Sequence, residues 1–158
     1  MFNTIGIITK PNDSVSDGIA EELSAFLQNK GAGVVGTNEQ IAEQADLIIV
    51  VGGDGTLLNT ARSFVDNNIP ILGINLGRLG FLADVSVGKM FEVVSQVLEG
   101  EFTKEERCLL SCQIEQDGRV IHKSVALNDA VVNRQDALKM IEFDVYIDGR
   151  FVNNQRAD

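Results

Sequence analysis

Residues 47–56 read LIIVVGGDGT, in which a continuous apolar run leads directly into a glycine-rich loop. A run without alternation of apolar and polar residues is typical of a parallel strand, because helices cover both faces of such a sheet. Apolar residues then recur at helical spacing over Leu57–Val65. The order strand, loop, helix predicts an open α/β sheet with the loop at the carboxyl end of a strand, where ligands bind in such sheets.

The alternation of strand and helix extends over residues 1–100. Apolar and amphipathic segments predict strands at Thr4–Thr9, Val34–Gly36 and Pro70–Ile74, and helices over Val15–Leu27, residues 38–45 and Lys89–Leu98. We expect Ser14 to cap the first helix, with Asp17 as its capping-box partner, and Gly100 to close the last. Residues 1–100 are therefore predicted to form an α/β domain with an open, mostly parallel sheet.

Beyond Gly100 the apolar pattern changes to a period of two, which is typical of antiparallel strands. Strands are predicted at Cys108–Glu115, Val120–Val132, Ile141–Ile147 and Arg150–Asn153. Asp117-Gly118 and Asp148-Gly149 are placed where tight hairpin turns are expected. The last residues, 153–158, are polar and contain no closing element, so we predict that residues 101–158 form an incomplete antiparallel β domain.

The composition excludes several classes of function. The chain has 158 residues, with 13 Lys and Arg against 23 Asp and Glu, and a net charge of −10. This charge argues against non-specific binding to nucleic acid or to an anionic membrane. There is no apolar run near the roughly 20 residues of a membrane span, and the start has no secretory pattern. The chain has two cysteines, Cys108 and Cys112, which we expect to be buried free thiols. Free thiols are typical of a reducing compartment, so a cytoplasmic protein is predicted.

The GGDGT loop is the strongest candidate site. Glycines allow the backbone to approach a ligand closely, and N–H groups at a helix N-terminus suit a phosphate. A carboxylate repels phosphate, so Asp54 fits such a loop if it binds Mg²⁺ or takes a proton from a hydroxyl group. The alternative is that Asp54 only caps the helix. The P-loop motif is absent from the sequence, and the glycines at 73, 77 and 80 do not form G-x-G-x-x-G.

Other candidate residues follow the loop along the chain. Asn75 and Arg78 are placed to meet a ligand or a phosphate after the next strand, although a glycine-rich turn explains them equally well. Phe81 is a candidate for packing against a ring, or a core residue. Asn128-Asp129 interrupts an apolar strand and suits a ribose, although a bulge or strand end explains the pair as well.

Together these segments resemble the bacterial ATP-NAD kinases. The resemblance rests on GGDGT at 52–56, GINLGRLGFLAD at 73–84, LNDAVV at 127–132, MIEFDVYID at 140–148 and NQRAD at 154–158. Their order and spacing match along the whole chain. Diacylglycerol, sphingosine and 6-phosphofructokinases share GGDG but not the later segments.

The resemblance implies an α/β domain followed by a β-rich NAD-binding domain, with the active site between them. It implies transfer of the γ-phosphoryl group of ATP to the 2′-hydroxyl of the adenosine ribose of NAD, assisted by a divalent cation, Mg²⁺. Asp54 would be the general base, and the residues implied to bind substrate are Asp54, Gly55, Asn128, Asp129, Lys139, Arg156 and Asp158. Their local context alone marks the last three of these positions as ordinary polar residues.

The sequence departs from the family at several positions. Asp129 replaces the usual Glu, and Asn59 replaces an Arg found in many relatives. The Gly-Ser-Thr-Ala-Tyr loop and the later strands of the family are absent, which predicts an amino-terminal portion that is weakly active or inactive alone. The resemblance implies a homo-oligomer for the full-length protein. It leaves the donor open between ATP and polyphosphate, and the acceptor open between NAD and NADH.

Two alternatives remain from the sequence. One is a lipid or sugar kinase of the wider GGDGT superfamily, which would have no affinity for NAD. The other is a non-catalytic nucleotide-binding module, in which Asp54→Asn would change neither ligand binding nor turnover.

Overall fold

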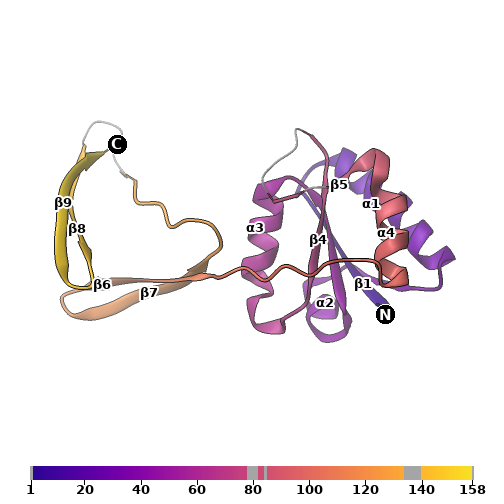
Figure 1. The fold of residues 1–158 in the computed structure, drawn as a ribbon, viewed down its shortest axis with the longest axis horizontal. Coiled ribbons are helices and arrows are strands. Elements are labelled where there is room, and N and C mark those ends of the chain that lie inside the picture. The colour runs from indigo at the N-terminus through magenta and orange to yellow at the C-terminus, as the bar shows by residue number, and fades with distance from the viewer. Residues whose placement is uncertain (1, 78–81, 84, 134–139, 158) are drawn as a thin grey trace. The chain divides into compact units, whose positions relative to one another are not determined.

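The protein forms two compact units, Met1–Leu109 and Leu110–Asp158, in the computed structural model (Figure 1). The structure describes residues 2–77, 82–83, 85–133 and 140–157. The sequence predicts a domain boundary near Gly100; the last helix of the first unit ends at Glu99, and the residues from there to Leu109 group with that unit.

The first unit is built around a five-stranded parallel sheet with the order β2-β1-β3-β4-β5. Its strands are β1 (Thr4–Thr9), β2 (Gly33–Val35), β3 (Leu47–Gly52), β4 (Ile71–Asn75) and β5 (Val85–Ser86). Its helices are α1 (Ser14–Asn29), α2 (Asn38–Gln44), α3 (Asp54–Ser63) and α4 (Met90–Glu99), with 3₁₀ turns at Val65–Asn67 and Val87–Lys89. The predicted open, parallel α/β sheet is confirmed.

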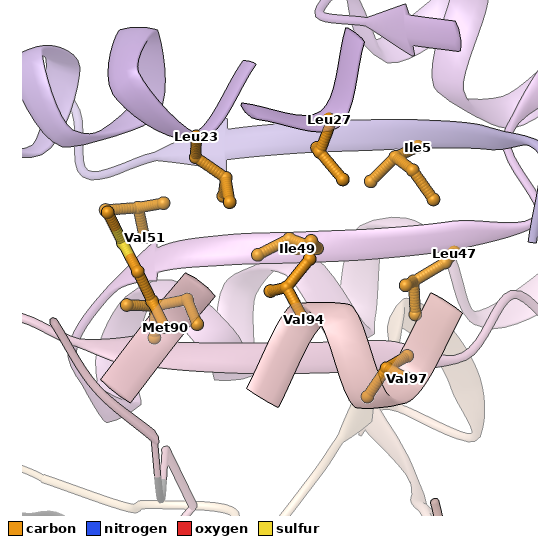
Figure 2. Close-up of a cluster of buried hydrophobic side chains, with 10 residues drawn as sticks. Ile5, Leu23, Leu27, Leu47, Ile49, Val51, Met90, Val94 and Val97 are labelled. Atoms are coloured by element: carbon orange, nitrogen blue, oxygen red, sulfur yellow. The ribbon is translucent and has the colours of Figure 1, made fainter. Parts of the chain in front are cut away.

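Helices cover both faces of this sheet, as the unbroken apolar run of β3 predicts. Every residue of β3 is buried. On one face, side chains of α1 and α4 pack against β1, β3 and β4, in a cluster formed by Ile5, Leu23, Leu27, Leu47, Ile49, Val51, Ile74, Met90, Val94 and Val97 (Figure 2). On the other face, Ile48 and Val50 of β3 pack with Ile41 of α2 and with Phe64, which directly follows α3.

Two of the predicted helix starts are wrong. The N-cap of α1 is Asp13, not Ser14, because the Asp13 carboxylate accepts hydrogen bonds from the backbone N–H groups of Val15 and Ser16. Helix α3 begins at Asp54, three residues before the expected start at Leu57, since the loop itself forms the first helical turn. The end of α4 is as predicted, with Gly100 in the left-handed region at φ 90°.

The second unit consists of two antiparallel hairpins, as the period-two pattern predicts. One pairs β6 (Leu110–Gln116) with β7 (Arg119–Ala126), and the other pairs β8 (Ile141–Ile147) with β9 (Arg150–Ala157). Both Asp-Gly turns adopt positive φ, at 50° and 72°, which confirms the predicted tight turns.

Several details of this unit differ from expectation. Strand β7 ends at Ala126, six residues earlier than predicted, and β9 extends through the polar residues to Ala157. The expected burial of the two thiols is also wrong: Cys108 precedes β6 and is exposed, and Cys112 lies on β6 and is half-buried. In the described part of the chain, no helix is long and apolar enough to cross a membrane.

Candidate functional site

The GGDGT loop lies at the carboxyl edge of the parallel sheet, beside the residues that follow the next strand. Strands β3 and β4 are paired in parallel, and the register aligns Gly52 with Asn75. The backbone N–H of Leu76 donates to the carbonyl oxygen of Gly52 at 3.2 Å, so the pairing extends past the end of β4. The topology therefore places Asp54 and Asn75 at the same edge of the sheet.

Asp54 connects the two loops directly. It is the first residue of α3 and is half-buried, and its Oδ1 accepts hydrogen bonds from the backbone N–H groups of Leu82 and Ala83, each at 3.2 Å. These donors lie 28 and 29 residues further along the chain. The contacts fix the orientation of the carboxylate relative to the sheet edge. The alternative role of Asp54 as a helix cap is not observed, since Gly53 occupies the cap position.

Asn75 is used to hold the backbone in the same region. The residue is 5% exposed, its Nδ2 donates to the carbonyl oxygen of Ala83 at 3.2 Å, and its Oδ1 accepts from the N–H of Gly77 at 2.9 Å. The Ala83 backbone is therefore bound through its nitrogen by Asp54 and through its oxygen by Asn75. No sequence motif indicates this role of the residues at 82 and 83, because it depends on their backbone alone.

The glycines of this edge serve two different purposes. A Cβ at Gly52 would lie 2.6 Å from Oγ1 of Thr56, so this glycine lets the first turn of α3 approach β3. A Cβ at Gly53 or Gly55 would meet no atom within 4 Å, and Gly55 is exposed. These two positions leave the N-terminus of α3, with its partial positive charge, accessible to an anion.

The candidate residues Asn128, Asp129 and Arg156 belong to the second unit. Asn128 and Asp129 are exposed and lie two and three residues beyond the end of β7, and Asn128 has a φ of 86°. Arg156 lies on β9 and its Nη2 is 3.3 Å from Oε2 of Glu142 on β8. The predicted residues Arg78, Phe81, Lys139 and Asp158 lie outside the described residues.

The described residues contain no group of three or more His, Cys, Asp or Glu side chains arranged to hold a metal ion. Mg²⁺ in phosphoryl-transfer enzymes is commonly held by substrate phosphates together with one or two carboxylates. Asp54 is a carboxylate of the loop that fits this type of coordination.

The comparison with protein families identifies the α/β part of the chain. Residues 34–102 match the model of the ATP-NAD kinase N-terminal domain. This range contains β3, the GGDGT loop, β4 and the segment bound by Asp54.

Individual relatives match over more of the chain. The NAD kinase of Hydrogenovibrio crunogenus is 42% identical over all of this chain and 60% of its own length. The NAD kinase of Aromatoleum aromaticum is 46% identical over 89% of this chain and 47% of its own length. The chain therefore spans about half to three fifths of the length of these relatives.

Solved structures show the same fold. Yeast NADH kinase, in a complex with NADH, has a TM-score of 0.82 at 23% identity. The match covers 99% of this chain and 55% of the yeast protein. An NAD kinase from Archaeoglobus fulgidus, in a complex with ATP, has a TM-score of 0.73 at 25% identity, with 98% of this chain and 58% of that protein covered. By the family match, the sequence relatives and the shared fold, this chain is similar to the amino-terminal part of the NAD kinases.

Proposed function

We propose that the protein is an NAD kinase, which transfers the γ-phosphoryl group of ATP to the 2′-hydroxyl of the adenosine ribose of NAD and forms NADP. The similarity to NAD kinases supports the reaction, and one observation carries the assignment to this site. Asp54 begins helix α3 at the carboxyl edge of the sheet, and two backbone N–H groups fix its carboxylate. A fixed carboxylate beside an anion-binding helix N-terminus suits phosphoryl transfer to a hydroxyl group.

In this proposal Asp54 is the general base. The carboxylate takes the proton of the attacking 2′-hydroxyl as the oxygen approaches the γ-phosphorus. The bonds from Leu82 and Ala83 to Oδ1 hold the carboxylate in one orientation, which matters because proton transfer requires hydrogen-bond distance and alignment. The backbone N–H groups of the loop at Gly53 and Gly55 bind phosphate oxygens.

A divalent cation, Mg²⁺, belongs to the same proposal. When bound to the nucleotide it neutralises charge on the β- and γ-phosphate oxygens. Asp54 is the residue of the described loop that would contribute a carboxylate oxygen to it, alongside the phosphates of the nucleotide.

Residues of the second unit are proposed to bind NAD. Asn128 and Asp129 are exposed and offer an amide and a carboxylate, which together match the donor and acceptor needs of vicinal ribose hydroxyls. Lys139, Arg156 and Asp158 are proposed as further contacts from their positions in the family motifs. Residues 101–158 would accordingly belong to a β-rich NAD-binding domain.

We also propose a cytoplasmic, homo-oligomeric protein. Free thiols at Cys108 and Cys112 fit a reducing compartment. Large apolar side chains of the second unit are exposed and available for packing between subunits; they include Leu110, Ile114, Ile121, Tyr146, Phe151 and Val152. Light scattering coupled to size-exclusion chromatography tests the oligomeric state.

The decisive assay measures NADP. The chain is incubated with NAD, ATP and Mg²⁺, in parallel with a chimera extended at its C-terminus by the remaining part of the Hydrogenovibrio crunogenus relative, and NADP is detected with an NADP-specific dehydrogenase. We expect NADP from the chimera. A folded chimera that produces none would exclude the kinase proposal. Binding of nucleotide without turnover would favour the non-catalytic module, and phosphorylation of a lipid or sugar instead of NAD would favour the wider superfamily.

A further inference from the structure

The order of the strands defines a point in the sheet where a ligand is expected. From β1 the chain crosses through α1 to β2 on one side, and from β3 it crosses through α3 to β4 on the other side. The two crossover helices cover opposite faces of the sheet, α1 with α4 on one and α3 with α2 on the other (Figure 1). Such a reversal leaves a crevice outside the carboxyl ends of the two central strands, where open α/β sheets bind ligands.

The residues that border this crevice are the ones that directly follow β1 and β3. The register pairs Thr9 with Val51, and the backbone N–H of Lys10 donates to the carbonyl oxygen of Val51 at 3.2 Å. Lys10 is therefore the neighbour of Gly52 across the strands. Among the described residues that directly follow β1, β3 and β4, Lys10 is the one with a positively charged side chain.

The Lys10 side chain is paired with Asp13 and stays accessible. Its Nζ lies 3.0 Å from Oδ2 of Asp13, and the side chain is 57% exposed. Asp13 is itself fixed, because its Oδ1 caps α1 through the N–H groups of Val15 and Ser16. Exposed ion pairs of this kind are weak, so they do not prevent the ammonium group from binding a more highly charged anion.

We propose that Lys10 binds a phosphate group of the nucleotide at the crevice between β1 and β3. The net charge of −10 makes a local cation necessary for a polyanionic ligand, and Lys10, whose backbone is the neighbour of Gly52 across the strands, carries such a charge. The inference rests on the proposed function, since it concerns the nucleotides of the same site. Both ATP and NAD carry phosphates, and separate titrations distinguish the two sources.

The test measures binding to the 158-residue chain directly, so it does not depend on turnover. Titration calorimetry with ATP in excess Mg²⁺, and separately with NAD, is carried out on the unsubstituted chain, Lys10→Ala, Lys10→Arg and Lys30→Ala. Lys30 follows the last residue of α1, at the other end of that helix from Asp13, and its substitution removes the same charge. Circular dichroism and thermal unfolding verify that each variant is folded.

We expect Lys10→Ala to weaken the binding of one of the two nucleotides about tenfold, as for the loss of one charge-assisted hydrogen bond. The Kd of Lys10→Arg should lie within about threefold of that of the unsubstituted chain, and the Kd of Lys30→Ala within about twofold, since both variants keep a positive charge at position 10. The nucleotide that is affected identifies the source of the phosphate.

Two results would overturn the inference: equal affinities of Lys10→Ala and the unsubstituted chain for both nucleotides, or no binding of either nucleotide by the unsubstituted chain. The proposed function fails separately. If Lys10→Ala lowers the nucleotide affinity of the 158-residue chain while the folded chimera forms no NADP, the phosphate contact stands and the kinase reaction is excluded.

Discussion

Oδ1 of Asp54 lies 3.2 Å from the backbone nitrogen of Ala83, 29 residues further along the chain. The proposed general base is thus also a structural contact between the loop after β3 and the segment after β4. The two roles require different properties of the side chain. Proton transfer needs a carboxylate, whereas the hydrogen bond needs only an oxygen acceptor. Two substitutions at this position can therefore separate catalysis from stability.

Asp54→Asn should abolish most of the turnover while leaving the fold intact. The amide oxygen still accepts hydrogen bonds from Leu82 and Ala83, but it cannot take the proton of the attacking hydroxyl. We expect kcat for NADP formation in the chimera to fall by about 10²–10⁴-fold, the usual contribution of a general base. Full turnover by the folded variant would disprove the role of Asp54 as base and leave the proposed kinase reaction unchanged.

Asp54→Ala should in addition destabilise the first unit. The substitution leaves the N–H groups of Leu82 and Ala83 without this acceptor in a half-buried region, which costs about 1–3 kcal/mol. Urea unfolding monitored by circular dichroism measures the difference. Asp54→Asn is the matched control and should lose much less stability; equal stability of the two variants would show that the contact contributes little.

Gly52→Ala should destabilise the protein because β3 and α3 approach each other closely at this position. The new Cβ would lie 2.6 Å from Oγ1 and 2.8 Å from Cβ of Thr56, so the first turn of α3 has to shift at a cost of about 1–3 kcal/mol. Gly18→Ala is the control: its Cβ meets no atom within 4 Å, and alanine in the middle of α1 should stabilise the protein by about 0.5–1 kcal/mol. Relative to the unsubstituted chain, we expect the free energy of unfolding to fall in Gly52→Ala and to rise in Gly18→Ala.

Asp13 should contribute a pH-dependent part of the stability. A hydrogen bond from Lys10, followed by one from the backbone N–H of Ser16, lowers the pKa of the Asp13 carboxyl below its ordinary value of 3.8. Because the pKa is lower in the folded state, the contribution is complete above the unfolded-state pKa and is lost as the pH falls through the folded-state pKa. Acid unfolding of Asp13→Asn, which keeps a capping oxygen, should lack this component.

The pKa of Asp13 also provides a direct check on its pairing with Lys10. Carbon NMR of the Asp13 carboxyl gives the titration in the unsubstituted chain and in Lys10→Ala. We expect the pKa to rise toward the ordinary value in the variant, since the largest cause of the shift has been removed. An unchanged pKa would show that the helix N–H groups alone determine the shift.

Asn128→Gly should weaken NAD binding without disturbing the backbone. Asn128 has a φ of 86°, a conformation that glycine adopts without strain, so this substitution removes only the amide. Loss of a hydrogen bond to a ribose hydroxyl corresponds to a rise of about five- to tenfold in the KM for NAD of the chimera, with the KM for ATP unchanged. An unchanged KM for NAD would exclude the proposed ribose contact.

The sequence by itself determined the class of the fold. LIIVV at 47–51 indicated a strand covered on both faces, and all of its residues are buried. The two Asp-Gly pairs predicted the hairpin turns, and GGDGT marked the edge of the sheet at which we propose the active site. These features were readable because they depend on periodicity and on the conformations that glycine and aspartate allow, which are local properties.

The tertiary structure alone decided which atoms meet at that edge. Asp54 and Ala83 become neighbours only because β3 and β4 pair in parallel, and the contact uses a backbone N–H that every residue except proline carries. The neighbourhood of Lys10 and Gly52 likewise follows from the placement of β1 beside β3, which the order of elements along the chain does not specify. Contacts of this kind leave no pattern in the sequence, since they are set by strand order and register rather than by residue type.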